Sequence, residues 1–535
     1  MTTAQSVETV LLLLAVVLLG MSAARRLPIP YPVLLVLAGL LASFVPGLPS
    51  LRLDPELVFF VFLPPVLWSA AYFTSLRDFR ANARPITLLA VGLVLATTAA
   101  VAVCARWLMP GLCWSAAIAL GAIVSPPDAV SATSIVRALG APRRVMTILE
   151  GESLVNDATA LILYRGAVAT AIGAAAFSPG ETALAFVLAA SVGVALGWAI
   201  GRGSAYALRI TNDTPTAILI TLMAPYLGWI LAEYAHASAV LACVAGGITF
   251  RRASVTDVAP SARLQAKPVW ELVVFAANGV LFLGIGLQLR GLAADVPAGG
   301  LRSVALHGAL FAALVIAVRL VWVPLFAWLP RALSPALRAR DPMPTWRALF
   351  LLGWTGLRGI VSLAAAMALP LTVADGSAFP YRSELLLITF AVIFCTLVLQ
   401  GLTLAPLVRA LHFPSDGDPR HEELEARAHA ARTALERLEV LASEPWAEPA
   451  TLGALREQYQ DRLRRASDGE SSLLADRAAK RARFESLMAE RLALDALRDR
   501  EQISDEVLLA LEAELDLEAA RHGLAELRRV ETLRD

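Results

Sequence analysis

A group of polar residues lies inside a long apolar segment of the sequence. The stretch GESLVNDATALILYR, which begins at Gly151, contains Glu152, Ser153, Asn156 and Asp157. A charged side chain deep in a bilayer is costly, and such residues usually mark ion pathways or proton relays. Hydroxyl, amide and carboxylate oxygens are hard donors that suit a dehydrated alkali cation. The stretch therefore predicts a cation site, and the carboxylate of Asp157 can also take a proton.

Helical spacing places these groups on two faces of one helix. Asp157 lies about eleven residues after the expected helix start near Met146, which is roughly half-way across a bilayer. Ser153 precedes Asp157 by one turn and shares its face, whereas Glu152 and Asn156 share another face. Asp157 and Ser153 are therefore expected to point the same way at mid-membrane depth.

A second carboxylate follows two prolines in the segment AIVSPPDAVSA. Pro126 and Pro127 have no backbone N–H and interrupt a helix, and Asp128 comes next. In lipid such an interruption is tolerated only where the freed backbone is buried in protein or lines a wet cavity. A simple proline kink is the alternative, but a carboxylate in mid-span favours a functional interruption.

Two arginines lie inside other apolar segments. Arg319, in VIAVRLVWVPL, needs a buried partner, and Glu152 is the best available acid. Arg358 lies in GWTGLRGIVSLAAA, between Gly356 and Gly359. Such glycines usually allow close helix packing. The arginine among them favours a second interrupted helix instead.

The composition around these residues is that of a membrane protein. Of the 535 residues, 57% are hydrophobic and 17% are charged, against about 25% charged in soluble domains. A membrane-spanning helix needs roughly 20 mostly apolar residues. The candidate spans lie near 6–24, 29–48, 56–74, 85–109, 112–137, 146–175, 181–201, 215–234, 237–250, 268–289, 301–329, 345–371 and 383–412. The ninth is short, and the eighth and ninth could form one broken element.

Basic residues are distributed unevenly between the loops. One set of alternate loops holds about 18 of them, including Arg25, Arg26, Arg143 and Arg144, whereas the other set holds about five. Cytoplasmic loops carry the excess of arginine and lysine. We therefore expect the N-terminus outside and the C-terminus in the cytoplasm, in a plasma membrane that would be the inner membrane of a bacterium.

The two interruptions occur at corresponding places in the chain. The spans near 112–137 and 345–371 each lie one span before the end of a six-helix group. Corresponding breaks in two halves are typical of inverted-repeat secondary transporters, whose sites lie at the membrane midplane. We expect an all-α polytopic membrane protein of about 13 transmembrane helices, with inverted repeats and two interrupted helices.

A domain boundary is expected after residue 412. Residues 1–412 would form the transmembrane transport domain and residues 413–535 a cytosolic helical tail. About 28 of the 45 acids and about 19 of the 46 bases follow residue 414. The tail is rich in helix-forming residues, and ISDEVLLALEAELDLEAARHGL begins with a capping residue, Ser504. Packing or dimerisation is its expected role, and regulation by an unknown ligand or partner is the alternative.

Other classes of protein fit the sequence less well. No H-E-x-x-H, Walker-type or G-x-S-x-G motif is present, so we expect no enzyme and no cofactor beyond the transported ions. A channel or sensor is an alternative, but a channel needs a ring of ligands that the sequence lacks. The net charge of +1 gives no indication of nucleic-acid binding. Polar residues such as Arg165 and Glu233 are expected at span ends or in structural pairs.

The motifs resemble those of the cation–proton antiporter superfamily, in its NhaP/NHE-type branch, over about residues 6–412. Members of the branch carry E-S-L-x-N-D, G-L-R-G and an interrupted helix with T-D-P. These correspond here to Glu152–Asp157, to Gly356–Gly359 and to Pro127 with Asp128. The resemblance implies exchange of a monovalent cation for H⁺ in pH homeostasis, with Na⁺ expected and Li⁺ or K⁺ as alternatives. It also implies a homodimer, an elevator-like movement and, from the Asn-Asp form of the motif, electroneutral one-for-one exchange.

The resemblance further implies roles for individual residues, with Asp157 as the exchanging carboxylate. The expected ion- and proton-binding residues are Asp157, Asn156, Asp128, Ser153 and Glu152, of which Asp157, Ser153 and Glu152 would contact Na⁺. The expected supporting residues are Arg319, Arg358, Ser125 and Pro127, with Arg319 paired to Glu152.

Two positions depart from the family pattern. Many relatives have L-P-P-I-x-x-E on the third span, whereas this chain has Ser69 in place of the acid, so Arg358 lacks its usual partner. The threonine of T-D-P is Pro127 here, which removes one oxygen ligand. Ser125 or a freed backbone carbonyl is expected to replace it, and a K⁺/H⁺ exchanger regulated by the tail remains an alternative.

Overall fold

The computed structural model describes residues 15–20, 22, 30–44, 54–173, 179–211, 213–254, 260–294, 300–374, 376–413, 419–467, 472–500 and 502–521. The contacts divide the chain into two compact units, Met1–Ser415 and Asp416–Asp535. Within the described residues, the regular elements are helices, and one isolated β-bridge joins Thr372 to Ala378. The all-α fold predicted from the sequence is confirmed.

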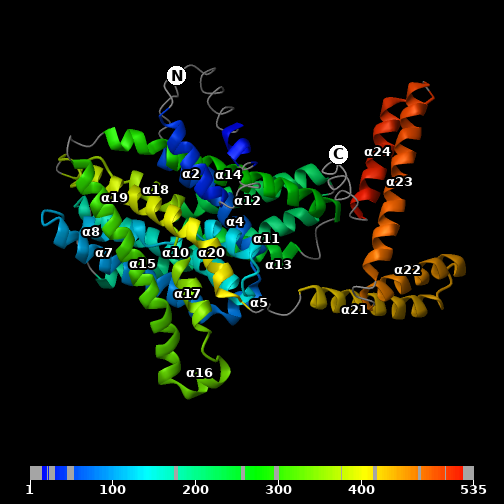
Figure 1. The fold of residues 1–535 in the computed structure, drawn as a ribbon, viewed down its shortest axis with the longest axis horizontal. Helices are drawn as coiled ribbons and strands as arrows, with labels where there is room; N and C mark the ends of the chain where they lie inside the picture. Colours follow the sequence, from blue (N-terminus) through cyan, green and yellow to red (C-terminus); the bar gives the residue numbers. More distant parts are fainter. Residues whose placement is uncertain are drawn as a thin grey trace. The chain divides into compact units, whose positions relative to one another are not determined.

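The first unit is a bundle of long apolar helices (Figure 1). Its helices are α2 (Tyr31–Ala42), α3 (Pro55–Leu57), α4 (Leu63–Phe73), α5 (Leu76–Ala81), α6 (Ala83–Thr87), α7 (Val94–Leu108), α8 (Trp114–Val124), α9 (Ala129–Ala138), α10 (Arg143–Ala171), α11 (Pro179–Arg209), α12 (Thr214–Tyr234), α13 (Ala239–Ser254), α14 (Pro260–Ala294), α15 (Gly300–Leu333), α16 (Pro335–Arg340), α17 (Trp346–Trp354), α18 (Ile360–Met367), α19 (Arg382–Cys395) and α20 (Gly401–Leu411). Three π-helical segments continue these helices: Val58–Phe62 before α4, Leu88–Leu93 before α7 and Thr396–Gln400 before α20.

The helices of the structure bear on the predicted spans in three ways. Of the described residues, seven helical stretches are long and apolar enough to cross a membrane, and α2 and α8 are shorter apolar helices. The first predicted span, 6–24, is described only at residues 15–20 and 22, which are helical. The eighth and ninth spans are separate helices, α12 and α13, because the chain turns at His236 with φ of 51°.

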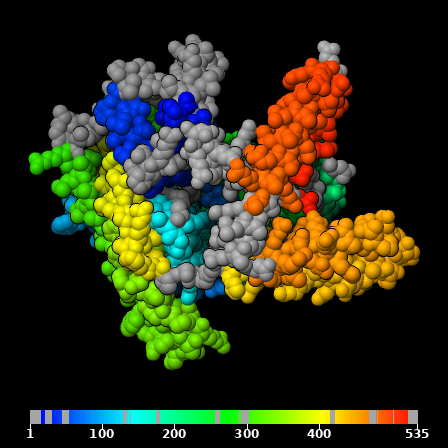
Figure 2. Space-filling view, turned by 45° about the vertical axis from the view of Figure 1, so that its right-hand side comes forward, coloured from blue at the N-terminus to red at the C-terminus, as the bar shows by residue number. Residues whose placement is uncertain are grey.

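The helices of the first unit form two groups (Figure 1), and Leu154 and Ala158 of α10 join the apolar core of the first group. In the first group, α4 and α11–α13 pack together around residues such as Leu67, Trp229 and Cys243. In the second group, α7–α10, α15 and α17–α20 pack around residues such as Leu120 and Phe311. In Figure 2 the yellow surface, near residue 400, belongs to the second group. It lies between the blue N-terminal helices and the green hairpin of α15 and α16. Helix α14 contacts members of both groups.

Glycines set how closely α14 approaches its neighbour α2. A Cβ atom on Gly39 would lie 2.2 Å from the carbonyl oxygen of Leu283, and one on Gly286 would lie 2.1 Å from the carbonyl oxygen of Val36. Both distances are far below van der Waals contact. The crossing of α2 and α14 therefore requires a residue without a side chain on each helix.

In the residues that the structure describes, the second unit consists of four helices with mostly exposed side chains. They are α21 (Pro419–Leu441), α22 (Pro449–Ser467), α23 (Ser472–Asp499) and α24 (Asp505–Arg521), which pack as the pairs α21–α22 and α23–α24. The predicted cap of α24 is present, because the Val507 N–H donates to the Ser504 hydroxyl over 3.3 Å. Leu487 and Leu515 form the small apolar core between α23 and α24.

Candidate functional site

The two predicted interruptions meet in the second helix group. Helix α8 ends at Val124 and α9 begins at Ala129, while α17 ends at Trp354 and α18 begins at Ile360. The N–H of Asp128 donates to the carbonyl of Leu357 over 2.7 Å. Each broken helix therefore gives up its own ladder of hydrogen bonds at this point and gains a partner from the other, which is what a buried interruption requires.

Arg358 completes this crossing through backbone carbonyls. Its Nε donates to the carbonyl of Val124 over 2.8 Å, its Nη1 donates to the carbonyl of Gly356, and its side chain is buried. The carbonyl oxygens that the interruptions release thus stabilise the positive charge of Arg358. The family pattern implied an acid at position 69 as the partner of Arg358, but Ser69 lines a different cavity, between α4 and α11–α14.

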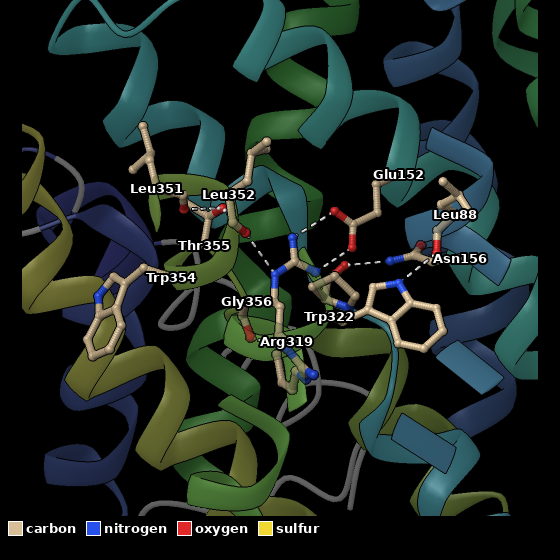
Figure 3. A network of polar contacts seen from close by, with 12 residues as sticks. Leu88, Glu152, Asn156, Arg319, Trp322, Leu351, Leu352, Trp354, Thr355 and Gly356 are labelled. Carbon is tan, nitrogen blue, oxygen red and sulfur yellow. Dashed lines mark hydrogen bonds and ion pairs between the residues drawn. The ribbon is translucent and has the colours of Figure 1, made fainter. Parts of the chain in front are cut away.

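The predicted pair between Arg319 and Glu152 is present (Figure 3). Both residues are 1% exposed, and two guanidinium nitrogens face the two carboxylate oxygens, with 2.7 Å between Nη2 and Oε2. The Nε of Arg319 donates to the carbonyl of Leu352, at 3.0 Å, near the end of α17. A bidentate pair of this kind fixes the position of α10 against α15 and α17.

A cavity of about 280 Å³ lies beside this crossing, between the two helix groups. Polar residues on its wall include Asp128, Ser153, Asp157, Asn278 and Ser362. Asp157 is 7% exposed, and a turn of α10 separates it from Ser153, so their predicted common face is the cavity face. Carboxylate, hydroxyl and amide oxygens together can coordinate a dehydrated monovalent cation.

The cavity continues from Asp157 to the surface of the unit. Arg137 and Glu150 also line it and form an ion pair of 2.5 Å, in which the Arg137 side chain is 72% exposed. Water and ions can therefore reach the buried carboxylates from the side of the membrane on which the α9–α10 loop lies. Because the Arg137–Glu150 pair at the entrance has no net charge, it attracts ions of either sign only weakly. Ion selectivity therefore depends on the residues inside the cavity.

Gly359 allows Asp128 to occupy its place on the cavity wall. A Cβ atom on Gly359 would lie 2.6 Å from the Cβ of Asp128. The backbone of Gly359 is extended, with φ of −136°, so its conformation does not itself require glycine. Close approach is therefore the reason that this position has no side chain.

Besides the two arginines, three expected site residues lie away from the cavity wall: Glu152, Asn156 and Ser125. Glu152 does not line it, and both of its oxygens contact Arg319, which does not support its expected role as a sodium ligand. The Asn156 side chain donates to the carbonyl of Pro127 over 3.0 Å and so stabilises the interruption (Figure 3). The Ser125 hydroxyl donates to the carbonyl of Ala122 over 3.1 Å, and Ser125 is not part of the wall either.

Sequence reasoning missed several polar residues of the cavity, among them Asn278 and Ser362. Asn278 is a single amide in the apolar run VVFAANGVLFL of α14, and Ser362 is a single hydroxyl in the first turn of α18. Both are buried, and the Ser362 hydroxyl has no hydrogen-bond partner. An amide in mid-span was a signal that could have been followed, whereas a serine in a membrane helix usually bonds to its own backbone and carries little information.

The two helix groups are also joined by an ion pair, which is one of the two expectations for Arg165, a structural pair or a place at a span end. Arg165 of α10 contacts Glu233 of α12 over 2.5 Å, with exposed fractions of 52% and 26% for their side chains. Arg165 lies about two turns beyond Asp157 along α10, toward the end opposite the cavity entrance. The pair thus links the groups on the far side of the site.

Crossed interrupted helices beside buried carboxylates define a class of membrane protein, the secondary transporters with a midplane ion site. Residues 11–410 match the family described as sodium/hydrogen exchanger, transmembrane. The chain therefore belongs to the sodium/hydrogen exchanger family, a family of monovalent cation/proton antiporters rather than of enzymes, and is a multi-pass membrane protein.

Individual relatives agree with this family over nearly the whole chain. An uncharacterised Na⁺/H⁺ exchanger of Mycobacterium tuberculosis is 34% identical, covering 95% of this chain and 94% of the relative. A sodium, potassium, lithium and rubidium/H⁺ antiporter of Bacillus pumilus is 30% identical, covering 93% and 75%. The solved sodium proton antiporter MjNhaP1 of Methanocaldococcus jannaschii has the same fold, with a TM-score of 0.57 and 15% identity over 76% of this chain and 99% of that chain.

Proposed function

We propose that the protein exchanges a monovalent cation, Na⁺ first, for H⁺ across the plasma membrane, with Asp157 as the group that carries both. The observation that supports this most directly is the continuous cavity from Asp157 to the exposed Arg137–Glu150 pair. The buried carboxylate can bind a proton or a cation, and not both at once, because one negative charge is compensated by one positive charge. Competition for this carboxylate is sufficient to couple the two fluxes.

The oxygens around Asp157 support cation binding. Ser153, Asn278, Ser362 and Asp128 line the same cavity, and a cation that leaves water must replace its hydration shell with such oxygens. Glu152 acts as a positioning residue and not as a cation ligand, because its carboxylate is paired with Arg319. On the open side a cation that enters displaces the proton from the Asp157 carboxylate, and on the opposite side of the membrane a proton displaces the cation.

The charge of the loops supports an orientation for the site. The cavity opens beside the α9–α10 loop, which is followed by Arg143 and Arg144 in the first turn of α10 and belongs to the arginine-rich set. By the positive-inside rule this side is cytoplasmic, so the conformation described above is open to the cytoplasm. Release to the outside then requires the second helix group to move relative to the first. The Arg165–Glu233 pair would have to separate in that movement.

The proposal also covers the stoichiometry, the oligomeric state and the second unit. Exchange is expected to be one for one, because a single carboxylate alternates between its two ligands. A homodimer is expected, and α11 offers a surface for it, since only 17% of its most apolar stretch is buried within one chain. The second unit is expected to lie in the cytoplasm and to pack or regulate.

Inside-out vesicles from cells without antiporters of their own test the exchange. After acidification of the interior, Na⁺, K⁺ or Li⁺ is added and the recovery of a pH-sensitive dye is followed. We expect recovery with Na⁺ that disappears in Asp157→Asn and persists in Glu384→Gln, which removes an exposed carboxylate outside the cavity. Recovery with K⁺ alone would identify a K⁺/H⁺ exchanger, in line with the cations named for the Bacillus relative.

Three results of the vesicle assay would contradict the proposal. No recovery with any of the three cations between pH 6 and 9 would exclude exchange. Recovery that persists in Asp157→Asn but disappears in Asp128→Asn would move the exchanging group to α9. A change in rate on clamping the membrane potential with valinomycin and K⁺ would exclude one-for-one exchange with Na⁺.

A further inference from the structure

The Ser362 hydroxyl lies on the wall of the ion cavity, which is the cavity that Asp157 lines. Ser362 is 1% exposed, and its Oγ has no hydrogen-bond partner among the residues that the structure describes. A buried polar group without a partner costs free energy, so such a group in a native structure needs a physical explanation. Its place on the wall indicates that its partner is something that enters the cavity.

The interruption between α17 and α18 is the reason that this hydroxyl has no acceptor. A hydroxyl in a membrane helix usually donates to the carbonyl three or four residues earlier, as Thr389 does to Leu385 over 2.8 Å. For Ser362 these positions are Gly359 and Arg358, which precede the first helical residue of α18, and the backbone of Gly359 is extended. Neither carbonyl therefore lies where a helix would place it, and the hydroxyl stays available to the cavity.

A side-chain amide reaches the same cavity from α14. Asn278 is 3% exposed, lines the cavity and lies in the apolar run VVFAANGVLFL. One turn later, Leu281 belongs to the same small apolar cluster as Ala364 of α18, so α14 and α18 meet at the level of the site. Asn278 and Ser362 therefore lie on the two helices of one contact, and both border the ion cavity.

The other hydroxyls on the described wall already have partners. The Thr74 hydroxyl donates to the carbonyl of Ala70 over 2.8 Å, and Thr133 and Ser153 have interaction partners of their own. Ser362 differs from them, because it can turn its oxygen toward a cation without giving up a hydrogen bond within the described residues.

The carboxylates of the cavity do not by themselves distinguish one monovalent cation from another. Asp128 and Asp157 supply negative charge, which attracts Li⁺, Na⁺ and K⁺ alike. Discrimination depends on the number of neutral oxygens, on their field strength and on the size of the cavity. A small cation approaches each oxygen more closely and gains more from it than a large one does. Neutral oxygens on the wall are therefore the groups that set a preference.

We propose that Ser362 and Asn278 determine which monovalent cation the site prefers. This role rests on the exchange proposed at Asp157, and it concerns two residues that exchange by itself does not require. The hydroxyl oxygen of Ser362 and the amide oxygen of Asn278 each replace one water molecule of the cation that the Asp157 carboxylate holds. Loss of either oxygen leaves the charge of the site unchanged and weakens its hold on small cations most.

The cation dependence of exchange in the inside-out vesicles tests this role. The KM and the maximal rate are measured with Li⁺, Na⁺, K⁺ and Rb⁺ for the parent, Ser362→Ala, Ser362→Thr and Asn278→Leu. We expect Ser362→Ala and Asn278→Leu to raise the KM of the smallest transported cation roughly tenfold, and that of the largest at most about twofold. Ser362→Thr keeps the hydroxyl and should retain the preference of the parent.

Two variants serve as matched controls. Ser69→Ala removes a buried serine hydroxyl of α4 that borders the separate cavity between α4 and α11–α14. Gln288→Leu removes a buried amide of α14 that does not line the ion cavity. Both should keep the KM ratios of the parent, because neither removes an oxygen from the ion cavity.

Cation binding is measured separately from transport. A bound cation stabilises the folded protein, so each of the four cations should raise the melting temperature of the purified full chain in detergent at alkaline pH. Asp157→Asn is the blank and should show no such rise. In Ser362→Ala and Asn278→Leu the rise should shrink more for the smallest cation than for the largest, and melting without added cation shows whether each variant is folded.

The outcomes separate this role from the exchange on which it rests. Equal KM changes for all four cations in Ser362→Ala and Asn278→Leu, or lower maximal rates at unchanged KM, would overturn the assignment while exchange stands. The same shift of preference in Ser69→Ala or Gln288→Leu would also overturn it. If the parent exchanges no cation, the proposed exchange fails, and the melting temperatures decide. Binding that requires Asp157 and changes its preference in Ser362→Ala would then support the assignment, and the absence of binding would overturn it.

Discussion

Arg358 and Val124 belong to different interrupted helices, and the Arg358 Nε donates to the Val124 carbonyl over 2.8 Å. The arginine therefore serves a backbone acceptor that the interruption of α8 has released. In a bilayer such an acceptor finds no water, so the hydrogen bond replaces one that a continuous helix would have made. This relationship explains why a cation is buried at the crossing although Ser69 stands in place of the family's usual acid.

Substitution of Arg358 by lysine should destabilise the crossing. Lysine has a single ammonium group and cannot reach the carbonyls of Val124 and Gly356 from two separate nitrogens. We expect a loss of roughly 2 kcal/mol in the free energy of unfolding, measured as a lower melting temperature in detergent. Arg80→Lys, at an exposed position, is the matched control and should melt like the parent. Equal melting of both variants would show that the carbonyl contacts contribute nothing.

The buried pair of Glu152 and Arg319 should behave as a unit. Removing one partner leaves an uncompensated buried charge, and we expect Glu152→Gln or Arg319→Met to lose about 3–5 kcal/mol of stability. The double variant should recover much of this loss, because no buried charge is left alone. Melting temperatures of the four proteins complete a double-mutant cycle. Additive losses would mean that the two side chains do not interact in the folded protein.

Gly359→Ala should displace Asp128 from the cavity wall. The new Cβ would lie 2.6 Å from the Cβ of Asp128, so the two interrupted helices must separate slightly. We expect a loss of about 1–3 kcal/mol and an increase in the KM for the cation in the vesicle assay. Gly203→Ala, where nothing lies within 4 Å of the added atom, should be neutral or stabilising. An unchanged KM in Gly359→Ala would show that Asp128 does not affect cation binding.

A cluster around Asp341 should make stability depend on pH in the acid range. This carboxylate, in the loop after α16, contacts Arg331 at 2.7 Å and Arg144 at 2.8 Å, and Arg84 at 3.0 Å. Partial burial raises the pKa of Asp341, but the hydrogen bond from Arg144 and the arginine charges together outweigh it, so its pKa is lower than usual.

The sign of the effect follows from this lowered pKa. The ionised carboxylate stabilises the folded state fully above the unfolded pKa of about 3.9, and the stabilisation is lost as the pH falls through the folded-state pKa. The difference in melting temperature between parent and Asp341→Asn should therefore be constant from pH 7 to about 5 and shrink below about 4. Glu384→Gln should show no such difference. A difference that grows on acidification would contradict the assignment.

Local patterns in the sequence determined much of this protein. Runs of apolar residues located the helices, because a chain in lipid must satisfy its backbone within helices. Pro126 and Pro127 located one interruption and the glycines around Arg358 the other. A buried charge requires a partner of opposite charge, and this requirement was enough to pair Arg319 with Glu152, although 167 positions separate them in the chain.

The tertiary structure decided which polar groups share a cavity. Helical periodicity fixes the face of each residue on its own helix but not which face of another helix lies opposite. For this reason Asn278 and Ser362 join Asp157 although helical periodicity does not link them to it, while Glu152 and Ser125 point elsewhere. The same reason placed Ser69 on a separate cavity between α4 and α11–α14 rather than beside Arg358. Packing between distant helices depends on the shapes of many side chains at once, and a single sequence read along the chain does not contain that geometry explicitly.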